Sequence, residues 1–337
     1  MPIRPISRRG FLFATGGLAA AAALAGCGDD SPANTAESTG AWEFTDDRGI
    51  KVTRDKQPAK VVAYVSSAAA LWDFGVRPIG VFGPQKTDSG AKEIQAGNID
   101  LSKTTSLGVV WDDFDVEKFI SLQPDLLVTG LTGTKKTDLW AITPETGEKV
   151  EKIAPILALS EYKVTLPKVI ERYEALAKAL GADVASATVT DAKKEFQAAS
   201  DELKTVAKEK AGLKVLVVYS DKDSVYVAKP EFFADLSYYK ELGLDIIAGG
   251  GSEDYWEQLS WEQVGKYPAD LILTDTRTFS LSKEQMNEYP TWRALPAVAA
   301  GQLGDWSAEP RFNYTLAAPV IRKLTTAIKN ARTDITA

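Results

Sequence analysis

The chain has 337 residues, of which 45% are hydrophobic and 25% are charged, and its formal net charge is −7 at pH 7. A chain of this length can build large hydrophobic cores and is usually divided between two domains. The acidic balance, without a basic stripe or a zinc-finger spacing, does not favour nucleic acid, so we expect no nucleic-acid partner. Histidine is absent and Cys27 is the only cysteine, which excludes an internal disulfide and both Ser-His and Cys-His catalytic pairs.

The N-terminus has the pattern of an export signal. Residues 7–12 read SRRGFL and resemble the twin-arginine consensus, while the apolar stretch 11–26 is shorter than the roughly 20 residues that span a bilayer. Residues 24–27 read LAGC and resemble the lipobox of bacterial lipoproteins. We therefore expect 1–26 to be a twin-arginine lipoprotein signal and Cys27 to carry lipid, which places the protein at the cell membrane on its extracytoplasmic face. Removal of 1–26 takes three arginines from the 39 basic residues and none of the 46 acidic ones, so the charge becomes −10.

Residues 27–41 are small and polar and are predicted to form a flexible tether. A hairpin should follow, turning at Asp47–Gly49. Short β-rich runs then alternate with helical patterns and return late in the chain, which indicates mainly parallel sheets covered by helices. The predicted strands are 61–65, 79–82, 126–129, 156–159, 215–219, 245–248 and 271–274, and the predicted helices include 68–74 and 116–122.

A helical region at 166–210 separates the two sets of strands. Val169, Tyr173, Leu176 and Leu180 share one face of a helix that ends at Gly181. A second helix, from about 183 to 208, would be roughly 35–40 Å long and could connect two lobes. The predicted lobes are residues 42–165 and 211–337. The competing interpretation is a surface helix of a single domain.

The two sets of strands contain similar segments. Residues 117–129 read EKFISLQPDLLVT and residues 262–274 read EQVGKYPADLILT. In both, a glutamate opens the segment, a proline follows six or seven residues later, and an aspartate precedes three aliphatic residues and a threonine. Each copy predicts a short helix, a proline turn and a buried strand, so the two lobes should be alike.

Several of these segments resemble ABC-importer solute-binding proteins of the iron-siderophore and cobalamin type. The resemblance rests on DDRG at 46–49, KVVAY at 60–64, LWDFGVRPIGV at 71–81, PDL at 124–126 and the long central helix, and it extends from about 42 to 328. It implies two similar α/β lobes with mainly parallel sheets, joined by one long rigid helix, with the ligand cleft between the lobes. It also implies a monomeric binding protein, not an enzyme, without a cofactor, catalytic residues or a bound metal, that serves an ABC permease dimer.

In this family a glutamate on each lobe contacts the permease, and Glu117 and Glu262 match those positions. Both also lie in the first turn of a predicted helix, where the helix dipole favours a carboxylate. Ser260 and Gln263 form a candidate capping box beside Glu262. We expect permease docking, because the two glutamates recur at equivalent points of both lobes.

Ligands of doubly wound sheets gather at the carboxyl ends of strands. Besides most of the ligand-binding residues listed below, this rule selects Ser66, Phe82, Thr129 and Thr132. Family resemblance adds Trp111. A core position is the competing interpretation for each aromatic residue. The predicted ligand-binding residues are Trp111, Arg277, Arg311, Tyr314, Tyr64, Tyr219, Tyr226 and Trp256.

Arginine suits a ferric chelate, because its guanidinium donates hydrogen bonds to iron-bound oxygens without competing for the metal. A tricatecholate complex carries about three negative charges and would require more cations than two arginines supply. We therefore expect a ferric siderophore of hydroxamate type. The alternatives are cobalamin or haem in the same fold and, from another class, a lipid-anchored envelope hydrolase with a carboxylate pair or a Ser-Lys site.

Overall fold

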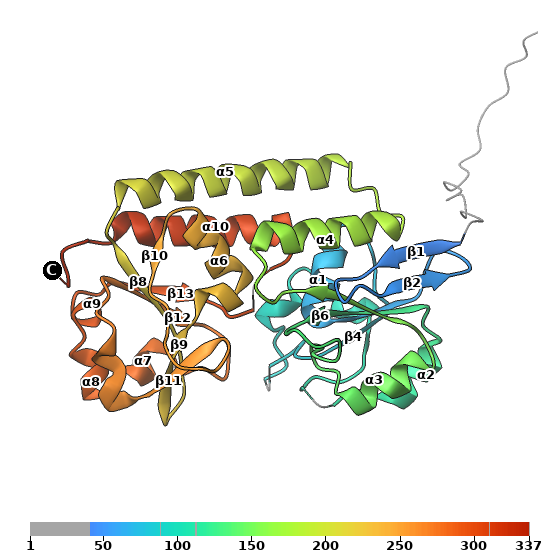
Figure 1. Cartoon of the computed structure of the whole chain (residues 1–337), viewed down its shortest axis with the longest axis horizontal. Helices are drawn as coiled ribbons and strands as arrows, with labels where there is room; N and C mark the ends of the chain where they lie inside the picture. The colour runs from blue at the N-terminus through green and yellow to red at the C-terminus, as the bar shows by residue number, and fades with distance from the viewer. Residues whose placement is uncertain (1–40, 88, 112, 310, 337) are drawn as a thin grey trace, which may run out of the picture. The chain divides into compact units, whose positions relative to one another are not determined.

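The structure is a computed structural model that describes residues 41–87, 89–111, 113–309 and 311–336 (Figure 1). The predicted signal, Cys27 and all but the last residue of the predicted tether lie outside the described residues. Within the described ranges, no helix is both long and apolar enough to cross a membrane.

The predicted hairpin is confirmed. Strands β1 (Trp42–Thr45) and β2 (Lys51–Arg54) pair antiparallel, with Thr45 opposite Lys51. The carboxylate of Asp46 organises the turn, because its Oδ1 accepts hydrogen bonds from the backbone N–H groups of Arg48 and Ile50 at 3.0 and 2.9 Å. Gly49 supplies the positive φ (74°) that the turn requires.

The N-terminal lobe contains a parallel sheet of five strands in the order β5-β4-β3-β6-β7. Its central strands β3 and β6 are buried along their whole length, which explains their almost uninterrupted apolar sequences. The strands are β3 (Val61–Tyr64), β4 (Gly80–Phe82), β5 (Thr105–Ser106), β6 (Leu126–Leu131) and β7 (Ile156–Ser160).

The C-terminal lobe contains a mixed sheet in the order β11-β9-β8-β12-β13, with the short β10 also pairing with β8. Strands β8, β10, β12 and β13 are parallel, whereas β9 runs antiparallel to both of its neighbours, β8 and β11. Along β8, Val215 and Val217 belong to the main core, while Leu216 and Val218 face a second cluster on the opposite side of the sheet. The strands are β8 (Lys214–Ser220), β9 (Ser224–Ala228), β10 (Asp245–Ile246), β11 (Trp256–Ser260), β12 (Leu271–Asp275) and β13 (Leu303–Trp306).

The helices cover the sheets and connect them. The α-helices are α1 (Val65–Asp73), α2 (Val116–Leu122), α3 (Pro144–Glu151), α4 (Leu166–Ala179), α5 (Ala187–Glu209), α6 (Ala234–Glu241), α7 (Lys283–Met286), α8 (Pro290–Arg293), α9 (Pro296–Ala299) and α10 (Tyr314–Asn330). The 3₁₀ helices are η1 (Ile94–Ala96), η2 (Leu101–Lys103), η3 (Pro230–Phe232) and η4 (Trp261–Lys266).

The predicted long helix is α5, which has 23 residues, follows the N-terminal sheet and precedes the C-terminal sheet. It lies beside α10 (Figure 1). Phe196 of α5 stacks on Tyr238 of α6 at 5.9 Å and contacts Tyr314 of α10 at 5.5 Å. Tyr314 in turn donates a 2.7 Å hydrogen bond to Glu174 of α4. The two lobes are therefore joined by one apolar core, although their exact limits at 165 and 211 stay predictions.

The repeated segments have equivalent roles in the two lobes. Asp125 Oδ2 accepts hydrogen bonds from the backbone of Ala59 and Lys60, just before β3, and Asp270 Oδ2 accepts one from Lys214, at the start of β8. Each aspartate thus fixes its own strand beside the central strand of its sheet. The helix predicted before the second proline is the 3₁₀ helix η4, and the Ser260–Gln263 capping box at its start is present.

Candidate ligand-binding cleft

Polar residues from both sheets meet at one cavity of about 280 Å³. Thr132 follows the end of β6 and Glu161 follows β7 in the N-terminal lobe. In the C-terminal lobe, Arg277 follows β12 and Glu309 follows β13. The carboxyl ends of parallel strands therefore supply the cavity from both lobes, as the strand-end rule predicts. Its lining residues are Trp111, Thr132, Trp140, Glu161, Phe232, Phe233, Ala234, Asp254, Tyr255, Trp256, Arg277, Ala308, Glu309 and Phe312.

Aromatic rings form the wall contributed by the N-terminal lobe. Trp140 stacks on the fully buried Tyr64 at 5.9 Å with an interplanar angle of 5°, and Trp111 contacts Trp140 at 4.5 Å. Trp111 remains 45% exposed and is therefore the accessible member of this group. Such a surface suits the organic part of a ligand.

Trp140 is held in place by Glu161 and by the absence of a side chain at Gly130. The indole Nε1 of Trp140 donates a 2.6 Å hydrogen bond to Glu161 Oε2. A Cβ atom at Gly130 would lie 2.4 Å from both Trp140 Cδ1 and Glu161 Oε1, so a larger residue there would displace one of them. The glycine thus permits the pair to pack against β6.

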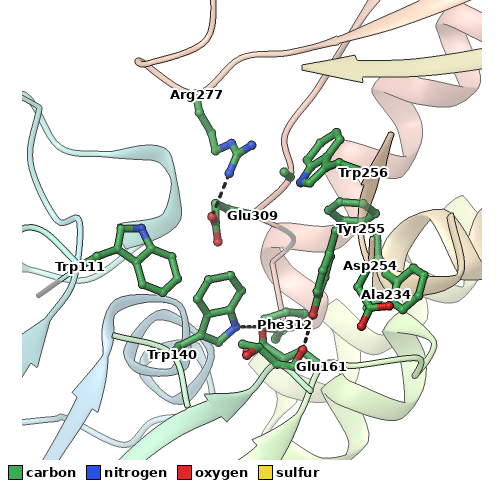
Figure 2. Close-up of a pocket in the computed structure, with 14 residues that line it drawn as sticks. Trp111, Trp140, Glu161, Ala234, Asp254, Tyr255, Trp256, Arg277, Glu309 and Phe312 are labelled. Carbon is green, nitrogen blue, oxygen red and sulfur yellow. Dashed lines mark hydrogen bonds and ion pairs between the residues drawn. The ribbon is translucent and has the colours of Figure 1, made fainter. Parts of the chain in front are cut away.

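Tyr255 contributes to the opposite wall and contacts the N-terminal lobe. It has a positive φ of 63°, which is uncommon for an aromatic residue, and its hydroxyl donates a 2.6 Å hydrogen bond to the carbonyl of Thr132. A second bond between lobes joins the hydroxyl of Tyr162 to Asp254 at 2.9 Å. Trp256 lies next to Tyr255 in Figure 2. Two hydrogen bonds that involve lining residues of the cavity therefore connect the lobes.

Arg277 lines the cavity, and its guanidinium is already paired with acidic side chains. Its Nε and Nη2 each lie 2.6 Å from Oδ2 of the buried Asp275, and its Nη1 lies 3.4 Å from Glu309 Oε1. The guanidinium also lies 4.5 Å from the ring of Phe279. Arg277 thus has a structural partner in Asp275, which the sequence analysis did not foresee.

The cavity holds more carboxyl groups than cations. Glu161, Asp254 and Glu309 line it, whereas Arg277 is the single basic residue among its described lining residues. Burial raises the pKa of Glu161 to about 8, against the hydrogen bond from Trp140. Burial likewise raises the pKa of Glu309 to about 7, although Arg277 opposes the rise. The site is therefore neutral to acidic, depending on pH.

The predicted ligand-binding residues fall into three groups: residues that line the cavity, residues that pack behind its lining, and residues that lie away from it. Trp111, Trp256 and Arg277 line the cavity, as does Thr132. Tyr64 is fully buried behind Trp140, where it supports the aromatic wall.

Tyr219 and Tyr226 form a stacked pair at 4.8 Å beside the cavity. Tyr219 contacts Trp256 at 5.7 Å and lies 5.6 Å from the guanidinium of Arg277. The hydroxyl of Tyr226 donates a hydrogen bond to Asp221. The pair supports two lining residues without lining the cavity itself.

The structure places Arg311 and Tyr314 away from the cavity. Arg311 lines a separate small hollow with Asp235 and Tyr239, and its pKa is lowered by burial. Tyr314 is 4% exposed and packs edge-on against Phe74, the residue that follows α1. Both side chains therefore belong to the packing around α10.

Sequence reasoning found four of the fourteen lining residues and missed the other ten. The strand-end rule would have found Glu161 and Glu309, because each follows a strand by one to three residues, but it was not applied to β7 and β13 was not predicted. Trp140 gave no such signal, since it lies on a loop that folds back along β6 through a bond from its N–H to Gly130.

The two predicted docking residues are both exposed. Glu117 lies in the first turn of α2 and Glu262 in the first turn of η4. Hydrogen bonding from Ser260 lowers the pKa of Glu262, which keeps that carboxylate charged. In the part of the chain that the structure describes, no cluster of three or more histidine, cysteine or acidic side chains could hold a metal ion.

Comparisons with known proteins agree with this architecture. Residues 62–310 match the family model described as "Periplasmic binding protein". The Fe(3+)-citrate-binding protein YfmC and the iron(3+)-hydroxamate-binding protein FhuD, both from Bacillus subtilis, are each 24% identical; the matches cover 84% of this chain and 84% and 85% of the relatives. The crystal structure of DesE, a ferric-siderophore receptor protein from Streptomyces coelicolor, is 40% identical with a TM-score of 0.82, covering 87% of this chain and 99% of DesE. The chain therefore belongs to the periplasmic binding protein family.

Proposed function

We propose that the protein captures a ferric siderophore of hydroxamate type and delivers it to an ABC permease. The observation that carries this proposal is the composition of the cavity: aromatic walls from both lobes, and one arginine already paired with Asp275. A tricatecholate complex, with about three negative charges, would meet the carboxyl groups of Asp254 and Glu309 without an unpaired cation among the described lining residues to compensate. Ferric trihydroxamates carry no such excess of negative charge. The likeness to DesE, described as a ferric-siderophore receptor, supports a ferric siderophore, and the likeness to FhuD, described as an iron(3+)-hydroxamate-binding protein, supports the hydroxamate class.

The test is tryptophan fluorescence of residues 28–337, titrated with ferric trihydroxamate, ferric tricatecholate, haem and cobalamin. Trp111, Trp140 and Trp256 line the cavity, so a bound ligand should quench them. We expect saturable quenching by the hydroxamate complex at submicromolar concentration and binding of the catecholate at least 100-fold weaker. The gallium complex controls for absorption by iron, and the iron-free hydroxamate controls for recognition of the metal complex. Tighter binding of catecholate, haem or cobalamin would refute the assignment to hydroxamates.

We also propose that the protein is exported by the twin-arginine route and anchored through lipid on Cys27. Support comes from SRRGFL at 7–12 and LAGC at 24–27. Replacement of Arg8 and Arg9 by lysine should retain the precursor in the cytoplasm. Cys27→Ser should abolish incorporation of labelled fatty acid while the exported protein still binds its ligand. Labelling of Cys27→Ser equal to wild type would refute the anchor.

A further inference from the structure

Arg277 is neutralised without the help of Glu309. Asp275 is 3% exposed and makes two 2.6 Å contacts with the guanidinium, whereas Glu309 makes one contact at 3.4 Å. No hydrogen bond joins Oε2 of Glu309 to another described residue, although the side chain is only 11% exposed and lines the cavity. Glu309 is therefore a carboxyl group with unused capacity to bind a donor or a cation.

The surroundings of Glu309 suit a cation better than a neutral donor. Figure 2 shows Glu309 between Arg277 and the indole of Trp140, with Trp111 beside them. Tryptophan faces attract cations, most strongly where water is excluded. The indole N–H of Trp140 already donates to Oε2 of Glu161, and the second oxygen of Glu161 is buried without a partner among the described residues. Aromatic faces and a buried carboxylate together are the groups that recognise an ammonium ion.

We propose that Glu309, with the rings of Trp111 and Trp140, binds a protonated amine carried by the ferric complex. This inference rests on the proposed function and narrows the cargo to ferric complexes with a basic group. Arg277 keeps its bond to Asp275, and the remaining aromatic residues cover the rest of the ligand. In the competing role, Glu309 contacts the guanidinium of Arg277 only in the ligand-free protein. When the ferric complex binds, its iron-bound oxygens would take over that contact and displace Glu309.

Two ferric linear trihydroxamates that differ at one end separate these roles. One has a free terminal amine and the other has the same amine acetylated. Titration calorimetry is performed at pH 8, above the pKa of about 7 of Glu309, so that this carboxyl is mostly ionised. We expect wild type to bind the amine form about tenfold or more tightly than the acetylated form.

Glu309→Gln keeps the size of the side chain but removes its charge, so it should weaken binding of the amine form about tenfold and leave the acetylated form unchanged. Glu284→Gln is the matched control, because Glu284 is exposed on α7 and does not line the cavity. Equal affinity of wild type for the two forms would overturn the proposal, even if Glu309→Gln failed to fold. So would a preference for the amine that survives in Glu309→Gln. Tighter binding of both forms by Glu309→Gln would also overturn the proposal, and it would indicate that Glu309 competes with the ferric complex for Arg277. If wild type bound neither form, the proposed function itself would be refuted.

Discussion

The indole N–H of Trp140 donates a 2.6 Å hydrogen bond to Oε2 of Glu161, and the other oxygen of Glu161 is buried without a partner among the described residues. A glutamate in this position is stable mainly in its protonated form, which is why burial raises its pKa to about 8. The protonation of Glu161 therefore affects both the stability of the fold and the wall of the ligand cavity, because the same carboxyl group orients the indole of Trp140 in that wall.

Replacement of Glu161 by glutamine should make stability less sensitive to alkaline pH. The raised pKa means that the folded protein binds the proton of Glu161 more tightly than the unfolded chain does. Its contribution is complete below the unfolded pKa of 4.5 and is lost as pH rises through about 8. Glutamine retains an acceptor for Trp140 but cannot ionise. We expect Glu161→Gln and wild type to be similarly stable at pH 5, and the variant to be more stable at pH 9 by on the order of 3–5 kcal/mol.

Urea unfolding at pH 5, 7 and 9 measures this difference. Glu309→Gln should show a similar dependence whose midpoint lies nearer pH 7. A difference between Glu161→Gln and wild type that stays constant from pH 5 to pH 9 would show that Glu161 ionises normally.

Removal of Arg277 should destabilise the fold as well as change the cavity. Asp275 is buried and depends on Arg277 for two contacts of 2.6 Å, so Arg277→Ala leaves an unpaired buried carboxylate at a cost of about 3 kcal/mol. The double variant Asp275→Asn/Arg277→Ala should recover much of that loss. Urea unfolding of both variants at pH 7 tests this, and equal stability of the two would contradict a structural role for the pair.

Arg311 should contribute to stability and not to affinity. It shares its hollow with Asp235, whose pKa is raised by burial to about 6 despite a 2.7 Å bond from Trp306. Arg311→Ala removes a positive charge near that carboxyl, so we expect a loss of about 2 kcal/mol in the free energy of unfolding. The affinity for ferric hydroxamate should remain within about twofold of wild type. A tenfold loss of affinity at unchanged stability would instead place Arg311 in the binding site.

The fold followed from the sequence because its signals are local and strong. Strands such as β6 are continuous apolar runs before a Gly or a polar residue, and α4 shows the spacing of a helix that ends at Gly181, whose φ is 87°. The 3₁₀ form of η4 was not predicted, because a helix of six residues and an α-helix of seven leave the same apolar pattern.

The site was predicted only in part, because its geometry depends on side chains far apart in the chain. Strand-end logic found Arg277 and Thr132, but not that Asp275 would hold the guanidinium from two residues away. Arg311 and Tyr314 follow the same strand as Glu309, yet at the start of α10 their side chains turn into the packing between the lobes. The direction of a loop residue is decided by such neighbours, which the linear sequence does not identify.

The two exposed glutamates provide a test of delivery that is independent of ligand capture. Glu117 and Glu262 lie at equivalent points of the repeated segments, on α2 and η4, and neither lines the cavity. Their joint replacement by alanine removes two charges from the surface without exposing a buried group, so affinity for the ferric hydroxamate should be unchanged.

If Glu117 and Glu262 dock to the permease as predicted, uptake of radiolabelled iron by cells that depend on this protein should fall at least tenfold in Glu117→Ala/Glu262→Ala, because each lobe would lose that contact. The matched control is Glu148→Ala/Glu284→Ala, which removes one exposed glutamate from each lobe on α3 and α7. The control should transport iron at the wild-type rate. Equal uptake by both double variants would show that Glu117 and Glu262 do not contact the permease. Their role would then be limited to the interaction of each carboxylate with the dipole of its own helix.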